Sequence, residues 1–182
     1  MEFPTTFSGG DRGVWRIVRL EAVLGAELPA AGRIAVEAGE SPRGEEVAWS
    51  LRGVPSYERY VRRDEQRELK ARSPLLGRPE ASLAALIPIR KSDAWWEMPQ
   101  DERRAIFEER SHHTAIGLRH LPAVARRLYH CRDLGEPFDF LTWFEFAPEH
   151  ADAFDELVTT LRATEEWAFV EREVDVRLER ER

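Results

Sequence analysis

Two adjacent histidines and a later arginine could combine into a reactive site. His112 and His113 lie between Ser111 and Thr114, and Arg126 follows thirteen positions after His113. A neutral imidazole can bind a metal ion, whereas the guanidinium keeps its charge and its N–H donors at neutral pH. Adjacent helical residues diverge by about 100°, so only one of the two histidines can reach a shared site. Without further information, the pattern also fits a histidine near a helix end and a solvated arginine.

The elements that must position these residues are predicted in the second half of the chain. The hydrophobic pattern alternates in some segments and repeats at spacings of three and four in others, which distinguishes strands from helices. Residues 81–182 therefore have the order β-α-β-β-α-β, which is typical of a ferredoxin-like antiparallel sheet with two helices on one face. The predicted elements are strands over 83–89, 126–131, 138–146 and 173–179, the last of them half-exposed, and helices over 98–117 and from 148 onward.

The first half, residues 1–80, is predicted to hold short strands and one charged helix. Strands are expected over 14–20, 32–36 and 46–51, and an exposed helix over 57–72. This composition favours an abbreviated second ferredoxin-like unit, although no sequence repeat relates the halves. We therefore predict an α+β fold in which residues 1–182 form a single domain.

Composition limits the classes of function. The chain has 182 residues, enough to bury a core, and its net charge of −7 argues against a general nucleic-acid binder. The same charge repels small anions, so an anion site would need a local cation. The single cysteine, the absence of a signal-peptide pattern at the N-terminus and the short apolar runs lead us to expect a cytoplasmic protein outside the membrane.

Several segments of the chain, taken in order, resemble the chlorite dismutase family. The resemblance covers most of the second half and, more weakly, residues 56–61. Each segment is weakly specific, but their order along the chain is that of the family. The segments are Leu86-Ile87-Pro88-Ile89-Arg90-Lys91-Ser92, Trp95-Trp96-Glu97-Met98, Glu102-Arg103-Arg104, His113, Arg126-Arg127-Leu128-Tyr129-His130, Phe138-Asp139-Phe140-Leu141-Thr142-Trp143-Phe144-Glu145 and Leu161-Arg162-Ala163-Thr164-Glu165-Glu166-Trp167.

The resemblance implies a ferredoxin-like α+β barrel that binds one haem b, with ferric iron, per subunit. His113 matches the proximal ligand of the iron, and Glu166 matches the carboxylate that accepts a hydrogen bond from that imidazole. Arg126 matches the catalytic distal arginine. Lys91 and Trp96 match positions that contact the haem propionates or ring. The chain length resembles that of the short, dimeric branch, which implies a homodimer.

The implied reaction converts chlorite to chloride and dioxygen, through ferryl haem and recombination with hypochlorite. An imidazole hydrogen-bonded to a carboxylate donates more electron density to iron. An arginine that cannot deprotonate can attract chlorite and retain hypochlorite until the O–O bond forms.

Two alternatives stay open at this stage. A coprohaem decarboxylase of haem biosynthesis shares the fold and the proximal histidine, but it resembles this chain less. It needs a reactive tyrosine where this chain has Trp95-Trp96, and glutamine or histidine at the position of Arg126. A non-catalytic haem carrier or sensor is the second alternative. Adjacent Glu165 also allows the carboxylate assignment to shift by one residue.

Overall fold

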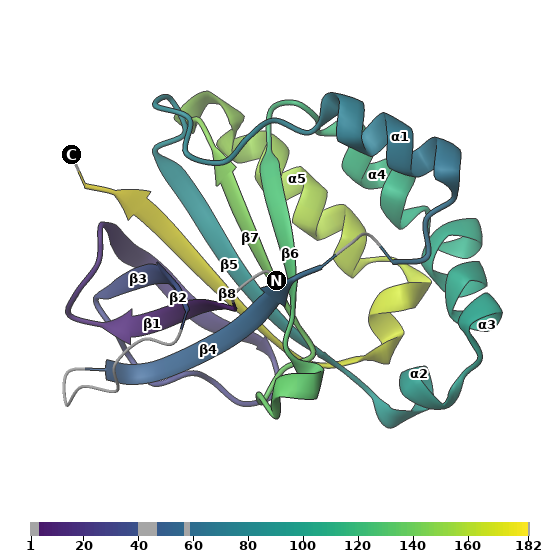
Figure 1. The fold of residues 1–182 in the computed structure, drawn as a ribbon, viewed down its shortest axis with the longest axis horizontal. Coiled ribbons are helices and arrows are strands. Elements are labelled where there is room, and N and C mark those ends of the chain that lie inside the picture. Colours follow the sequence, from purple (N-terminus) through teal and green to yellow (C-terminus); the bar gives the residue numbers. More distant parts are fainter. Residues whose placement is uncertain (1–3, 40–46, 57–58, 182) are drawn as a thin grey trace.

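The chain forms a closed antiparallel barrel of eight strands with helices packed on one side (Figure 1). The computed structural model describes residues 4–39, 47–56 and 59–181. The α+β class expected from the sequence is confirmed. The strands are β1 (Thr5–Gly10), β2 (Trp15–Leu24), β3 (Arg33–Ala38), β4 (Val47–Pro55), β5 (Leu83–Lys91), β6 (Ala125–His130), β7 (Phe140–Phe146) and β8 (Val170–Arg180).

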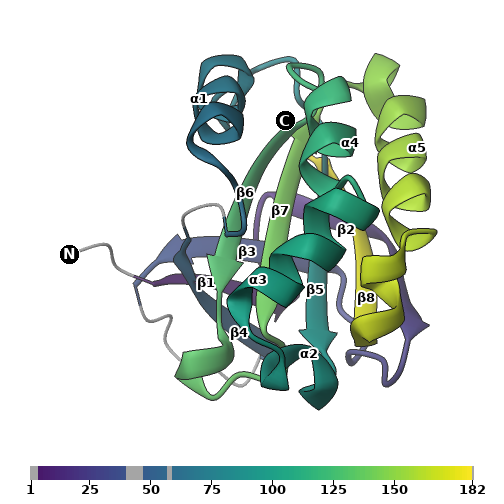
Figure 2. The same ribbon diagram turned by 90° about the vertical axis from the view of Figure 1, so that its right-hand side faces the viewer.

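The helices gather on the outer face of the sheet formed by β5, β6, β7 and β8. Figure 2 shows α3, α4 and α5 in front of β5, β6 and β7. A π-helical turn (Ala105–Arg110) joins α3 to α4, and a 3₁₀ turn (Glu165–Phe169) joins α5 to β8. Shorter 3₁₀ turns occupy Arg132–Leu134 and Pro148–His150. The α-helices are α1 (Arg63–Arg72), α2 (Asp93–Glu97), α3 (Gln100–Arg104), α4 (His113–Arg119) and α5 (Ala151–Arg162).

The strand order repeats within the barrel. Around the closed sheet the strands run β1-β3-β2-β8-β5-β7-β6-β4. The first four strands therefore have the order β4-β1-β3-β2, and the last four have the corresponding order β8-β5-β7-β6. The two groups meet at two junctions. Strands β2 and β8 pair from Trp15 with Arg180 to Leu24 with Glu173. Strands β4 and β6 pair at Val54 with His130 and at Pro55 with Tyr129.

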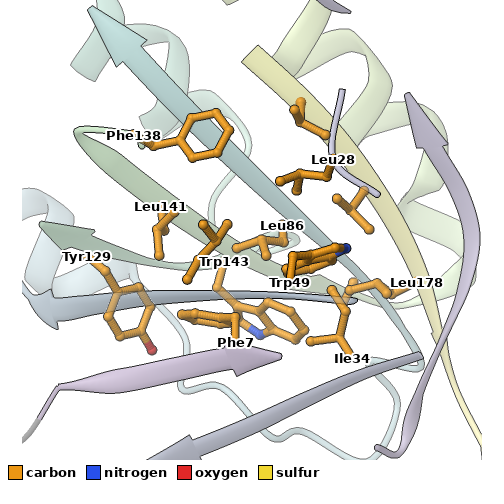
Figure 3. Close-up of a cluster of buried hydrophobic side chains, with 14 of the residues drawn as sticks. Phe7, Leu28, Ile34, Trp49, Leu86, Tyr129, Phe138, Leu141, Trp143 and Leu178 are labelled. Carbon is orange, nitrogen blue, oxygen red and sulfur yellow. The ribbon is translucent and has the colours of Figure 1, made fainter. Parts of the chain in front are cut away.

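Large aromatic and aliphatic side chains from both groups of strands fill the barrel interior (Figure 3). Phe7 of β1 is fully buried and lies between Tyr129 and Trp143, with ring centroids 5.2 and 5.6 Å away. Val174, Val176 and Leu178 of β8 belong to this cluster, as their alternation with charged residues predicts, but the half-exposed strand that the same pattern predicts is wrong, because Glu173 and Asp175 on the other face are also buried. A second cluster lies between the outer face of β5–β8 and helices α4 and α5, and it surrounds the site described below.

The continuous helix predicted over 98–117 is wrong. The segment divides into α3, the π-helical turn and α4, and the chain changes direction at His112, whose φ is 55°. Few non-glycine residues adopt this left-handed conformation, so the hydrophobic pattern did not reveal the break. Buried Glu108 stabilises the new helix start by accepting hydrogen bonds from two of its backbone N–H groups.

Two predictions for the first half also need correction. The charged helix expected over 57–72 begins only at Arg63, because Tyr60 has a φ of 61° and Glu65 caps the new start through the N–H of Arg62. Residues 57 and 58 lie outside the described part. Strand β1 was not predicted, since its sequence contains one large apolar residue and ends in two glycines. Within residues 4–39, 47–56 and 59–181, no helix is both long and apolar enough to cross a membrane.

Candidate haem-binding cavity

The break at His112 makes His113 the first residue of α4 and directs its ring toward the 3₁₀ turn Glu165–Phe169. His113 Nδ1 lies 2.6 Å from Oε2 of Glu166, and the other oxygen, Oε1, lies 2.7 Å from Nζ of Lys91. His112 is exposed instead. A carboxylate at Nδ1 favours the tautomer with the proton on that nitrogen, which leaves the Nε2 lone pair available for a metal.

Glu166, rather than Glu165, is the partner of His113. Glu165 is half exposed and pairs with Arg110. Both Glu166 and Lys91 have only 5% of their side chains exposed. Burial raises the pKa of Glu166, but the hydrogen bond from His113 and the charge and hydrogen bond of Lys91 outweigh it and bring the pKa well below its ordinary value. The carboxyl group therefore stays ionised and holds the imidazole in one orientation.

Aromatic rings pack around His113 and Lys91, the two residues that contact Glu166. The ring of Phe107 lies 4.3 Å from the His113 imidazole, centroid to centroid, and the planes differ by 18°. The Trp167 ring is also nearly parallel to the imidazole, at 6.4 Å and 22°. Lys91 Nζ lies 4.5 Å from the centre of the Trp95 ring. These contacts restrict rotation of the imidazole and shield the Lys91–Glu166 ion pair from water.

His113, Glu166, Lys91 and Arg126 all line one cavity between the sheet and the helices. The space between its walls, including the solvent at its open side, is about 1240 Å³. Its walls are mainly apolar, and charged side chains from different elements also line it. Arg126 enters from β6, whereas His113 enters from α4. The apolar walls include Ile87, Ile89, Leu128, Phe140, Phe144, Leu157, Val158 and Leu161.

The two tryptophans of α2 lie differently relative to the cavity. Trp95 lines the cavity and is 1% exposed. Trp96 lies beside the cavity wall, where it stacks on Phe140, donates to Asp139 Oδ2 at 3.1 Å and meets the Arg132 guanidinium at 4.3 Å. Neighbouring residues on a helix face different sides, so at most one could face the cavity, and the sequence did not reveal which. Contact between Trp96 and haem stays a prediction.

Gly117 and His120 are cavity residues that sequence reasoning missed. Gly117 lies on the same helix as His113, and His120 directly follows the end of that helix. Their spacings of four and three residues place all three on one helix face, which would have identified them once His113 was chosen. Burial lowers the pKa of His120, which favours its neutral form. Tyr60 and Arg59, which the sequence offers as residues that could close over a haem edge, also line the cavity.

The residues present fit a large, flat, anionic cofactor such as haem. A Cβ added to Gly117 would meet no atom within 4 Å, so this part of α4 faces open space. The Nε1 of Trp95 is buried and has no hydrogen-bond partner, and such donors are rarely left unpaired in proteins. A carboxylate on a bound ligand would satisfy it. Nε2 of His113, which does not face Glu166, could bind the metal of such a cofactor.

Comparisons with known proteins agree with this geometry. The family model described as chlorite dismutase matches residues 37–180. The chain is 31% identical over 120 residues to chlorite dismutase from Ideonella dechloratans, a match that covers 64% of this chain but only 39% of that relative.

Solved structures give the same result. A dimeric chlorite dismutase from Nitrobacter winogradskyi superposes with a TM-score of 0.91 at 61% identity, covering 97% of this chain and 99% of that one. A mutant chlorite dismutase from Candidatus Nitrospira defluvii shares the fold at 22% identity and a TM-score of 0.70, covering 100% and 93% of the two chains. This chain belongs to the chlorite dismutase family.

Proposed function

We propose that this chain is a haem-dependent chlorite dismutase that converts chlorite to chloride and dioxygen. The observation that carries the proposal is the pairing of His113 with buried Glu166 on the wall of a cavity that Arg126 also lines. The pairing leaves Nε2 as the metal-binding atom, and the arginine adds a permanent positive charge in the same cavity.

Haem b would be held by His113 at the iron and by polar groups of Lys91, Trp95 and Trp96 at its periphery. When bound, the ferric iron supplies the redox centre that can accept an oxygen atom from chlorite. Glu166 keeps the proton on Nδ1 and increases the electron donation of the imidazole. Lys91 balances the charge of Glu166, so the carboxylate is stable although it is buried.

Arg126 would bind the anionic substrate and keep chlorine oxyanions within the cavity. The chain carries a net charge of −7, so chlorite needs a local cation to approach. The guanidinium cannot act as a base near neutral pH, but its N–H groups can stabilise negative charge on oxygen. The apolar walls around it exclude water, which strengthens that interaction.

We also propose the finer assignments of fold and assembly. The order β8-β5-β7-β6, with helices after β5 and β7, supports a ferredoxin-like second half, and the order β4-β1-β3-β2 supports an abbreviated unit before it. Together these halves would form one domain. Similarity to the dimeric protein of Nitrobacter winogradskyi supports a homodimer. Location in the cytoplasm stays a prediction from the sequence.

Coprohaem decarboxylation is the second candidate, and Tyr60 is the observation that favours it. Tyr60 lines the cavity, its ring meets the Trp95 ring edge to face, and its hydroxyl accepts a hydrogen bond from Arg103 at 3.0 Å. A tyrosine in the cavity wall could take part in the oxidation of a porphyrin side chain. Turnover of iron coproporphyrin with peroxide would support this candidate, and haem binding without either activity would support a carrier.

Oxygen evolution from chlorite by the haem-loaded protein tests the proposal. We expect wild-type protein to release dioxygen and chloride in equal amounts. Arg126→Ala should keep haem but lose most of the oxygen evolution, because removal of one oxyanion-stabilising donor typically costs 10²–10³-fold in rate. Loaded wild-type protein that releases no dioxygen would contradict the proposal.

A further inference from the structure

Buried Glu173 has no part in the function proposed above, although it lines the same cavity. It lies on β8 and is 1% exposed. Arg162, the last residue of α5, donates to its Oε1 from Nε at 2.8 Å and from NH2 at 2.7 Å. A buried ion pair rarely stabilises a fold more than apolar side chains of similar volume. Stability alone therefore gives little reason for this pair on a mainly apolar wall.

The other carboxylate oxygen of Glu173 accepts a hydrogen bond from Trp167, which follows Glu166 in the chain. Nε1 of Trp167 donates to Glu173 Oε2 at 2.8 Å. Trp167 directly follows Glu166 in the 3₁₀ turn, which has only five residues. Short 3₁₀ turns have poor internal hydrogen-bond geometry, so contacts from outside must fix their position.

The turn has separate anchors for its backbone and for its side chains. Ser111 Oγ accepts a hydrogen bond from the Glu166 N–H at 2.9 Å, which fixes the backbone at that residue. The indole of Trp167 is fixed by Glu173 and lies nearly parallel to the His113 imidazole. A tilt of this indole would move the turn that carries the Glu166 carboxylate, and with it the hydrogen bond to Nδ1.

We infer that Glu173 is a positioning residue that acts through Trp167 on the Glu166–His113 hydrogen bond. Arg162 fixes the carboxylate, the carboxylate fixes the indole, and the indole keeps the turn in place. The effect on haem rests on the proposed function, but the effect on the imidazole exists in the haem-free protein. Two substitutions break the link between the indole and the carboxylate: Trp167→Phe keeps a ring but removes the N–H, and Glu173→Gln leaves one acceptor oxygen for three N–H donors.

The primary test is NMR of the haem-free protein labelled with ¹⁵N at histidine. In the wild type, the Nδ1 proton of His113 should be protected from solvent by its short bond to Glu166. In Trp167→Phe and in Glu173→Gln, this proton should exchange at least about 10-fold faster. The double variant should exchange no faster than Glu173→Gln alone, because both changes break the same link.

Trp143→Phe is the matched control. Trp143 also donates its indole N–H to a buried carboxylate, Glu145 Oε1 at 2.9 Å, but it lies in the barrel core and does not line the cavity. This variant should lose stability and leave the His113 signal unchanged. Folded Trp167→Phe and Glu173→Gln proteins with the wild-type signal and exchange rate would overturn the inference, as would an equal change in the control.

Haemin binding gives the second readout. Loss of a residue that orients a metal ligand typically weakens affinity 10- to 100-fold, so Trp167→Phe should bind haemin about 10-fold more weakly, with an altered iron–histidine stretching frequency. A wild-type affinity and frequency would contradict the inference. If wild-type protein fails to take up haemin, the proposed function fails, whereas the haem-free measurement still decides the role of Glu173.

Discussion

The two groups of four strands share one order but differ on their outer faces. Strand β5 of the second group is buried along nearly its whole length, because the barrel core covers one face and helices cover the other. Strand β2 of the first group alternates between core and solvent, and Val18 and Leu24 on it are 45% and 44% exposed. A strand buried on both faces has a near-continuous apolar sequence, and a half-exposed strand alternates.

This difference explains where the cavity can form. Inside the barrel, side chains from both groups pack into one hydrophobic cluster. On the outer face of the second group, α4 and α5 pack against the sheet and leave the cavity lined by His113 and Arg126. The shared interior thus provides rigidity, and the helix-covered face provides the site.

The largest expected effect is in the shared interior. Phe7→Ala should destabilise the protein by about 3–5 kcal/mol, because the ring is fully buried and contacts both Tyr129 and Trp143 of the other group. Urea unfolding followed by tryptophan fluorescence and by circular dichroism measures this loss. Both signals should still change in one transition. Two separate transitions in the wild type would show that the strand groups do not share one cooperative core.

Glycine-to-alanine changes in the two regions should have opposite signs. At Gly9 of β1, a Cβ would lie 2.0 Å from the Trp49 ring, which a hydrogen bond to the Pro29 carbonyl holds in place. Gly9→Ala should therefore cost about 1–3 kcal/mol. Gly32→Ala is the control, since the nearest atom to its Cβ would be 3.9 Å away. An equal loss of stability in both variants would contradict the steric explanation.

At Gly117, on the cavity side of α4, the same change should stabilise the haem-free protein. A Cβ there meets no atom within 4 Å, and alanine is favoured over glycine within a helix by up to about 1 kcal/mol. Gly117→Ala should raise the unfolding midpoint, whereas Gly117→Leu should reduce haemin uptake because the longer side chain enters the cavity. Unchanged haemin binding by folded Gly117→Leu protein would mean that the cofactor lies elsewhere.

The smallest expected effect is a pH dependence at the junction of β6 with β4. Burial, together with the positive charge of Arg59, lowers the pKa of His130 to about 4. Between about pH 6.5 and pH 4 the unfolded chain binds a proton at this residue and the native chain does not, so stability falls as pH decreases through that range. His130→Phe should reduce this slope, and Arg59→Gln should reduce it partly. A wild-type slope in His130→Phe would exclude His130 as its source.

Much of this arrangement could be predicted from the sequence, but the local breaks could not. The alternation over 174–178 and the apolar run 83–89 correctly predicted two strands of the second half. The alternation did not reveal that Glu173 and Asp175 are buried as well, because an ion pair with Arg162 allows that. The family resemblance selected His113 and Glu166, and these two residues do make contact.

The features that were missed depend on single backbone conformations. His112 and Tyr60 adopt left-handed φ values that neither residue type favours strongly, and both change the direction of the chain at the cavity. The choice between Trp95 and Trp96 depends on the rotation of a five-residue helix, which has too few residues to show a period. Tertiary contacts determine these features, and local sequence does not encode them.

The most direct test of the central claim is a spectral titration of wild-type and His113→Ala proteins with haemin. The wild type should bind one equivalent with the absorption spectrum of a ferric, histidine-ligated haem. His113→Ala should bind far more weakly or lose the histidine signature, and added imidazole should restore that signature. An unchanged spectrum and affinity in folded His113→Ala protein would contradict the account, since the iron would then be held by another residue.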